Sequence, residues 1–405
     1  VIDLRAMAPT QAILDAAREH RADIIGLSGL ITPSLDEMVT VASEMERQGF
    51  DIPLMIGGAT TSPAHTSLKI EPRYPGDTVY VKDASRAVGV ASKLLGEQRQ
   101  AYSDELRRDH EAKRASYASK KAAPLLPFAE AVRRAESLQF DKTTVHAPAQ
   151  LGIQVLNNYP LTALLDTIDW MPFFNAWEFS GRFPDILNDP IKGVEAKKLF
   201  ADAQSMLERI IDEQWLEARA VFGLFPAYSD ENRIVILDPW TQKPLETTHW
   251  LRQQKPMPDG KPQLCLADFV APMTSEVTDY IGAFAVTTGH GIDHYVKAFE
   301  DAHDDYSAIM LKALADRLAE SFAEHVHRRV RKEFWGYAED EVLSNDELIR
   351  ETYRGIRPAP GYPACPDHRE KETLFRMLDV EANTGISLTK SMAMTPTASV
   401  SGFYF

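Results

Sequence analysis

The sequence predicts an α/β domain built on a doubly wound parallel sheet, followed by an α+β domain with long helices around an antiparallel sheet. Within roughly the first hundred residues, short apolar runs alternate with amphipathic stretches. The runs, such as IIGLSGLI, lack polar alternation, as is typical of strands covered by helices on both faces. From Phe128 onward, helical segments come first and short strand-like runs follow. That order is α+β patterning and not a repeated strand–helix unit.

Apolar runs mark the strands of the first domain, and amphipathic stretches mark its helices. We predict strands within Asp23–Ile31, Ile52–Gly58 and Thr78–Val81, and helices over Ser34–Gln48 and Ala84–Leu95. Doubly wound sheets bind ligands outside the carboxyl ends of their strands. The loops Ser28–Thr32 and Gly57–Thr61 follow two of the predicted strands. These loops are therefore the candidate ligand site of this domain.

A charged segment separates the two patterns. Between about Gly96 and Ala123 the chain is dense in Arg, Lys, Glu and Gln, and it then meets Pro124 and Pro127. We predict a solvated helical linker over 98–124. The first domain would then span 1–97 and the second 125–405.

The second domain contains one long helix and a predicted hairpin. Apolar residues recur at three- and four-residue intervals between Asp305 and Phe334, so one face of this helix is predicted to be buried. Acidic residues open the helix and basic residues close it, as the helix dipole favours. The strand-like runs AVFGLFPAYS and RIVILD are separated by the turn-forming residues 230–232.

Composition limits the classes of function. A chain of 405 residues favours two or three domains. The formal net charge of −15 argues against a nucleic-acid or anionic-membrane surface, and there is no apolar run long enough to span a bilayer. The two cysteines, Cys265 and Cys365, lack metal-type spacing, which excludes a readable disulfide framework or zinc site. We therefore expect a reducing, cytoplasmic setting.

Two segments of the first domain, DIIGLSGLITPSLDEM and IPLMIGGATTSPAH, resemble the later strands and loops of the flavodoxin-like, cobalamin-binding domain of cobalamin-dependent methionine synthases. The resemblance implies that six residues line the cobalamin: Ser28, Leu30, Thr32, Gly57, Gly58 and Ala84. The Ser28 hydroxyl would donate to a ring nitrogen of the nucleotide tail. The paired glycines would let the backbone approach that tail, because no Cβ intrudes.

One family motif is missing from the sequence. The family's Asp-x-His-x-x-Gly motif, whose histidine coordinates cobalt, lies upstream of a segment like VIDL, so we expect the first domain to be N-terminally incomplete. None of the eleven histidines has an equivalent context, and we assign no metal ligand. The family implies zinc only in a homocysteine domain that does not occur here.

In the second domain, RETYRGIRPAPGYPACPDH resembles the S-adenosylmethionine-binding segment of the same family's reactivation domain. The resemblance, together with Asp169 in TIDWMPFF, implies a site made of Asp169, Glu351, Arg357, Pro358, Ala359, Gly361 and Tyr362. The planar guanidinium of Arg357 can hold both oxygens of the ligand's carboxylate. Asp169 and Glu351 would favour its ammonium or sulfonium group. The prolines and Gly361 would shape the loop so that its backbone faces the ligand.

The family transfers a methyl group from methyltetrahydrofolate to homocysteine through methylcobalamin. Its reactivation domain brings S-adenosylmethionine to oxidised cobalamin, and reduction by a flavodoxin-type electron donor is trapped by methylation. Homocysteine and methyltetrahydrofolate would bind to domains absent from this chain. The resemblance therefore implies a cobalamin- and S-adenosylmethionine-binding part of a methyltransferase that does not complete the overall reaction alone.

Several alternatives stay open at this point. A non-enzymatic corrinoid carrier or sensor would share the first-domain loops, but it would have no reason to carry Arg357 and its neighbours. An unrelated α/β protein with a helical partner domain would make every match coincidental. Taken singly, a Gly-Gly after a strand suits an ordinary turn, and an aspartate before Trp-x-Pro suits a helix cap. His290 and His294 have a metal-compatible spacing, but Gly291 interrupts the helix and favours a structural role.

Overall fold

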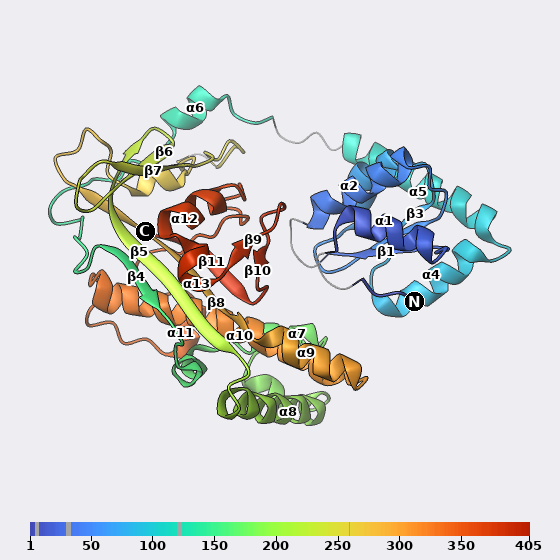
Figure 1. Cartoon of the computed structure of the whole chain (residues 1–405). Coiled ribbons are helices and arrows are strands. Elements are labelled where there is room, and N and C mark those ends of the chain that lie inside the picture. The colour runs from blue at the N-terminus through green and yellow to red at the C-terminus, as the bar shows by residue number, and fades with distance from the viewer. Residues whose placement is uncertain (5–7, 30–33, 120–123, 259) are drawn as a thin grey trace. The chain divides into compact units, whose positions relative to one another are not determined.

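The computed structural model describes residues 1–4, 8–29, 34–119, 124–258 and 260–405. The chain forms two compact units, Val1–Pro124 and Leu125–Phe405 (Figure 1).

The described part of the first unit contains a three-stranded parallel sheet in the order β1-β2-β3. Its strands are β1 (Ile25–Ser28), β2 (Leu54–Gly57) and β3 (Thr78–Tyr80). Around them lie α1 (Thr10–Glu19), α2 (Ser34–Arg47), α3 (Pro63–His65), η1 (Thr66–Ile70), η2 (Glu71–Arg73), α4 (Ala84–Leu95) and α5 (Arg99–Ser119). The side chains of Leu54 and Ile56 are fully buried in the core beneath α1 and α2. The predicted α/β class with a parallel sheet is confirmed.

Helix α5 corrects the predicted linker. The segment is helical, as expected, but it packs on the first unit and is not solvated along its whole surface. His110 is buried, with Nδ1 2.8 Å from the Ser67 hydroxyl and Nε2 2.8 Å from the Thr78 carbonyl oxygen. Leu106 and Tyr102 lie one and two turns earlier, respectively, and pack against β3 and α4. Composition did not indicate this face because its apolar and histidine side chains, at a spacing of four, lie within a segment rich in charge.

The second unit is organised around an antiparallel sheet in the order β11-β8-β5-β6-β7, with β4 also paired to β5. Its strands are β4 (Gly152–Leu156), β5 (Glu217–Asp230), β6 (Arg233–Leu237), β7 (Pro244–His249), β8 (Asp279–His290) and β11 (Ser399–Tyr404). β9 (Ser387–Leu388) and β10 (Met394–Thr395) form a separate small pair. The predicted hairpin is present, since β5 and β6 join through a turn in which Glu231 has a φ of 56°.

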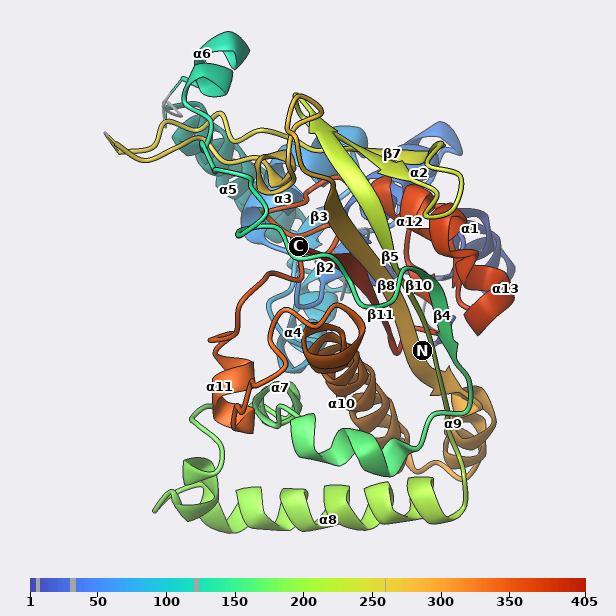
Figure 2. The same cartoon turned by 90° about the vertical axis from the view of Figure 1, so that its left-hand side faces the viewer.

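Helices cover both faces of this sheet (Figure 2). The helical segments are α6 (Phe128–Arg133), η3 (Leu161–Thr167), α7 (Met171–Ala176), η4 (Asp185–Asn188), α8 (Gly193–Asp212), η5 (Leu266–Phe269), α9 (Ile292–Asp301), α10 (Asp305–Arg329), η6 (Val330–Phe334), α11 (Asn345–Ile349), α12 (Glu370–Leu378) and α13 (Val380–Thr384). Phe222 and Tyr404 face the α10 side, whereas Val221 and Phe403 face the α12 side. This alternation confirms the predicted α+β class.

Helix α10, continued by η6, confirms the predicted long amphipathic helix. Asp304 caps its first turn by accepting a hydrogen bond from the Ser307 amide at 3.0 Å. Leu311, Leu318 and Phe322 are fully buried, so the apolar stripe faces the sheet as predicted. The helix continues without a break into the π-helical turn η6. It therefore spans the unit and can carry side chains into a buried site.

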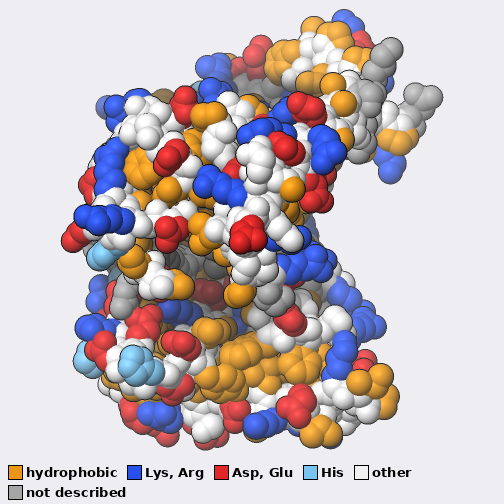
Figure 3. Space-filling model, turned by 90° about the vertical axis from the view of Figure 1, so that its right-hand side faces the viewer, with side chains coloured by type: hydrophobic (Ala, Val, Ile, Leu, Met, Phe, Trp, Pro, Cys, Tyr) orange, Lys and Arg blue, Asp and Glu red, His pale blue; other side chains and the backbone are white. Residues whose placement is uncertain are grey.

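Surface features are mixed. Acidic and basic side chains are interspersed on the face in Figure 3, where apolar side chains also reach the surface. Among the residues that the structure describes, no helix has both the length and the apolar character needed to cross a membrane.

Candidate functional site

A buried row of alternating charges lies beside α10 in the second unit. The Arg331 side chain is fully buried and donates to Glu341, with Nη2 2.8 Å from Oε1. Its Nη1 atom lies 3.5 Å from Oε1 of Glu324. The other oxygen of Glu324 lies 3.2 Å from Nη1 of Arg357. The row Glu341, Arg331, Glu324, Arg357 therefore ends at the arginine that the sequence predicted to bind a carboxylate.

The backbone around Arg357 is held by the last strand. Ile356 exchanges two hydrogen bonds of 3.1 Å with Phe405, and the Pro358 carbonyl accepts from the Phe403 amide at 2.9 Å. Arg357 thus lies on a short extended segment added beside the end of β11. Because this segment is anchored at both ends, the direction of the Arg357 side chain is set by the sheet.

Burial and neighbouring charges decide the ionisation of this row. Burial raises the pKa of Glu324, against the lowering effects of Arg357 and Arg331. Burial acts to lower the pKa of Arg357, but Glu324, Tyr353 and Tyr404 outweigh it, so that the pKa of Arg357 is raised. Arg357 is therefore a permanent cation in a largely desolvated place.

Aromatic rings enclose the charges. Arg331 lies 4.0 Å from the centroid of the Tyr353 ring. His327 stacks on Tyr404, with ring centroids 5.0 Å apart, and meets Tyr353 edge-on. Within the part of the chain that the structure describes, the ring nitrogens of His327 and the Tyr404 hydroxyl are buried without a hydrogen-bond partner, and Nη1 of Arg357 has the ion pair with Glu324 but no aligned hydrogen bond. Buried polar atoms normally have partners, so this concentration of unpaired ones marks a site.

The segment carrying Asp169 reaches the same helix. Thr167 precedes it by two residues, and its hydroxyl lies 2.8 Å from the hydroxyl of Ser321, one turn before Glu324 on α10. The Ile168 carbonyl accepts from Asn345 of α11 at 3.0 Å. The structure therefore brings the segments of Asp169 and Arg357 to neighbouring turns of α10. One oxygen of Asp169 also accepts from the Met171 amide at 2.9 Å, which is the turn-forming role that the sequence left open.

The remaining predicted residues of this site differ in their surroundings. Glu351 is exposed, with a φ of 53°, and its charge acts on Glu324. The side chain of Tyr362 is 66% exposed. Gly361 has a φ of 100°, and a Cβ there would lie 2.2 Å from the ring of His368, so only glycine fits.

The backbone of the Ala359–Tyr362 loop is largely bonded within itself. The Gly361 amide donates to the Cys365 carbonyl at 2.7 Å, and the Tyr362 amide donates to the Ala359 carbonyl at 3.3 Å. The Gly361 and Tyr362 amides are therefore used within the turn. That other backbone groups of Ala359–Tyr362 face a ligand stays a prediction.

In the first unit, the described residues of the two predicted loops meet at the carboxyl ends of β1 and β2. The Gly29 amide donates to the Gly57 carbonyl at 2.9 Å, and Ser28 is exposed at the end of β1. A Cβ on Gly58, which has a φ of 103°, would lie 2.3 Å from the backbone of Gly29. The absence of a side chain at Gly58 is thus required by contact between the two loops. Leu30 and Thr32 lie outside the described residues, and the side chain of Ala84, the first residue of α4, is also not described.

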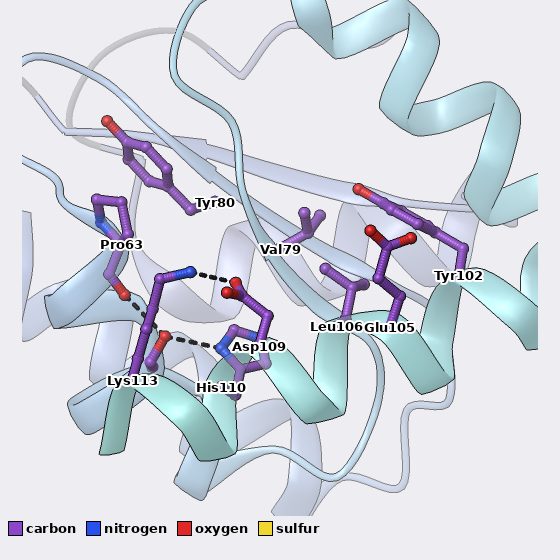
Figure 4. A pocket seen from close by; sticks show the side chains of 10 residues that line it. Pro63, Val79, Tyr80, Tyr102, Glu105, Leu106, Asp109, His110 and Lys113 are labelled. Atoms are coloured by element: carbon purple, nitrogen blue, oxygen red, sulfur yellow. Dashed lines mark hydrogen bonds and ion pairs between the residues drawn. The ribbon is translucent and has the colours of Figure 1, made fainter. Parts of the chain in front are cut away.

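Two cavities among the described residues lie away from Arg357. One, of about 240 Å³, lies between α5 and β3 in the first unit and is lined by Tyr80, Tyr102, Glu105 and Lys113 among others (Figure 4). Another, of about 420 Å³, lies in the second unit and is lined by Trp177 and Tyr306 among others. Neither is lined by a predicted site residue. Geometry and charge at Arg357 therefore identify the candidate site better than cavity volume does.

Sequence reasoning missed most of the residues that surround Arg357. These are Glu324, His327, Arg331, Glu341, Tyr353 and Tyr404. A signal was present for part of the set, because Glu320, Glu324, His327 and Arg331 recur at helical spacing from α10 into η6. The helix-dipole interpretation of the charges at the helix ends does not indicate a site. Among the described residues, no group of three or more potential ligands could hold a metal ion.

Comparison with known proteins defines the class to which these two units belong. A family model described as "B12 binding domain" matches residues 1–91, which make up most of the first unit. The chain thus joins a B12-binding-type α/β unit to a second unit with a buried arginine site. A second model, "Vitamin B12 dependent methionine synthase, activation domain", matches residues 160–405.

A solved structure extends this match. The crystal structure of the MetH reactivation domain bound to AdoHcy is 50% identical in sequence, with a TM-score of 0.67, over 70% of this chain and 87% of that one. This chain belongs to the vitamin B12-dependent methionine synthase family. Its domains are therefore those of a methyltransferase family, and the alternative of an unrelated α/β protein is excluded.

Proposed function

We propose that this chain binds cobalamin through its first unit and S-adenosylmethionine through its second, and that it serves the reductive remethylation of oxidised cobalamin in a methionine synthase. The observation that carries the proposal is Arg357. Its guanidinium is held on one side by Glu324 and makes no hydrogen bond to any described residue. In the solved relative, the corresponding domain is bound to AdoHcy, whose amino-acid part bears a carboxylate.

The chemistry of the site suits a zwitterionic ligand. Arg357 offers unused N–H donors in the planar arrangement that matches a carboxylate. Asp169 and Glu351 add acidic groups on segments that meet the same end of α10. When bound, cobalamin supplies the cobalt that accepts the methyl group. The residues of this chain contribute binding and orientation, and no protein nucleophile is required.

The proposal includes partners that this chain does not contain. A flavodoxin-type donor would deliver the electron, and homocysteine and methyltetrahydrofolate would be bound by other domains of the parent synthase. The chain alone would not complete the overall methyl transfer. A cytoplasmic setting remains part of the proposal.

Calorimetric titration with AdoHcy tests the ligand assignment. We expect saturable binding by the unaltered protein and at least about tenfold weaker binding by Arg357→Ala, the loss for one charge-assisted hydrogen bond. Arg369→Ala is the matched control, since Arg369 lies on the same segment but is exposed and paired with Asp367. Equal binding by the unaltered protein and Arg357→Ala would refute the assignment. A corrinoid carrier or sensor would bind cobalamin but not AdoHcy.

A further inference from the structure

Glu324 of α10 touches both buried arginines of the site. Its Oε1 atom lies 3.5 Å from Nη1 of Arg331, and its Oε2 atom lies 3.2 Å from Nη1 of Arg357. Only 11% of the glutamate side chain is exposed. The two oxygens are therefore divided between two guanidinium groups.

The two arginines depend on Glu324 to different degrees. Arg331 has a second carboxylate, because Glu341 accepts from its Nε at 3.0 Å and from its Nη2 at 2.8 Å. It also lies over the ring of Tyr353. Arg357 has neither kind of support: the ion pair with Glu324 is the one that the structure records for it among the described residues. Glu324 is thus redundant for Arg331 and essential for Arg357.

The other neighbours of Arg357 give it no substitute. His327 is fully buried, and burial lowers its pKa, so the ring is neutral. Tyr404 presents a buried hydroxyl without a partner in the described residues. Glu320, one turn earlier on α10, acts on Arg357 by its charge but forms no recorded ion pair with it in the described residues. Without the charge of Glu324, two guanidinium groups would repel each other. Arg357 would be the one to move, because its side chain is 18% exposed and that of Arg331 is fully buried.

We propose that Glu324 is a positioning residue for ligand binding: it fixes one side of the Arg357 guanidinium so that the remaining donors meet the ligand's carboxylate. The inference rests on the proposed function, since it requires a ligand with a carboxylate at Arg357. It adds a residue that never contacts the ligand but determines how well that carboxylate is held.

A pair of glutamates allows a controlled test. Glu324 and Glu341 are similarly buried, with side chains 11% and 9% exposed, and both pair with Arg331. Only Glu324 contacts Arg357. We would compare Glu324→Gln with Glu341→Gln by calorimetric titration. The ligands are AdoHcy and methylthioadenosine, which lacks the amino-acid part.

We expect Glu324→Gln to weaken AdoHcy binding by about tenfold and to leave methylthioadenosine binding unchanged. Glu341→Gln should leave both affinities within about twofold. A purely structural role would lower the melting temperature of both variants and weaken both ligands alike. If Glu324→Gln fails to fold, Glu324→Asp replaces it, because the shorter side chain keeps the charge but withdraws it from Arg357. The same AdoHcy-selective loss is expected.

Three outcomes would overturn the inference. They are equal weakening by Glu324→Gln and Glu341→Gln, equal weakening for both ligands, and tighter AdoHcy binding by Glu324→Gln, which would make Glu324 a competitor of the ligand. Failure of the unaltered protein to bind AdoHcy is a distinct result. It would overturn the proposed function and this inference with it.

Discussion

The two units build their candidate sites from different materials. In the first unit, the loops after β1 and β2 are shaped by backbone contacts, above all the approach of Gly58 to Gly29. In the second unit, the site depends on charged side chains from α10, from η6 and from the segment held beside β11. The first site is therefore expected to be destabilised by an added side-chain atom, and the second by removal of one partner of a buried ion pair. Four substitutions test this contrast, in order of decreasing expected effect.

The largest effect is expected for Arg331→Met. It would leave two buried glutamates, Glu324 and Glu341, without their shared cation. We expect the free energy of unfolding of the second unit to fall by about 4 kcal/mol, as is usual when one partner of a buried pair is removed. Urea unfolding followed by tryptophan fluorescence measures it. A loss below about 1 kcal/mol would mean that the charged row contributes little to stability.

Gly58→Ala tests the backbone site. A Cβ there would strain a φ of 103° and collide with the Gly29 backbone at 2.3 Å. We expect the first unit to lose about 3 kcal/mol. Gly26→Ala is the control, since a Cβ at Gly26 has no atom within 4 Å. Hydrogen exchange of the β1 and β2 amides reports the change. Equal exchange in the two variants would contradict the proposed contact.

His110→Ala examines the attachment of α5 to the first unit. It removes both ring contacts, to Ser67 and to Thr78. We expect a loss of about 2 kcal/mol, together with faster hydrogen exchange along α5. His20→Ala, at an exposed position of the same unit, should change neither quantity. Unaltered exchange in α5 would restore the solvated linker that the sequence predicted.

The smallest effect is a pH dependence at His325. Burial lowers the pKa of this histidine to about 4, from an ordinary value near 6.5. Between these values the unfolded chain binds the proton and the folded chain does not, so stability is lost as the pH falls from 6.5 towards 4. His325→Gln should reduce that loss by on the order of 1 kcal/mol in unfolding measured at pH 7 and pH 5. The exposed His294→Gln should not. Identical pH dependence in both would refute the assignment.

The same contrast explains what could be predicted from the sequence. The strands of the first unit and the helix α10 were predictable because their signals are local runs and periods. The attachment of α5 was not, because its few buried side chains lie in a segment otherwise rich in charge. The helical spacing that includes Glu324 did not indicate Arg357 as its partner, since their meeting follows from the placement of β11 beside residues 356–358. The resemblance found Arg357, but only the fold gives it its neighbours.

The hydrogen bonds that join Ile356 and Pro358 to Phe405 and Phe403 have a consequence for the ligand site. The backbone on both sides of Arg357 is held by residues that follow it by almost fifty positions in the chain. Substitutions that break these backbone hydrogen bonds would release Arg357 without changing its own side chain. A substitution that disrupts β11 would therefore weaken ligand binding as a substitution in the binding site does.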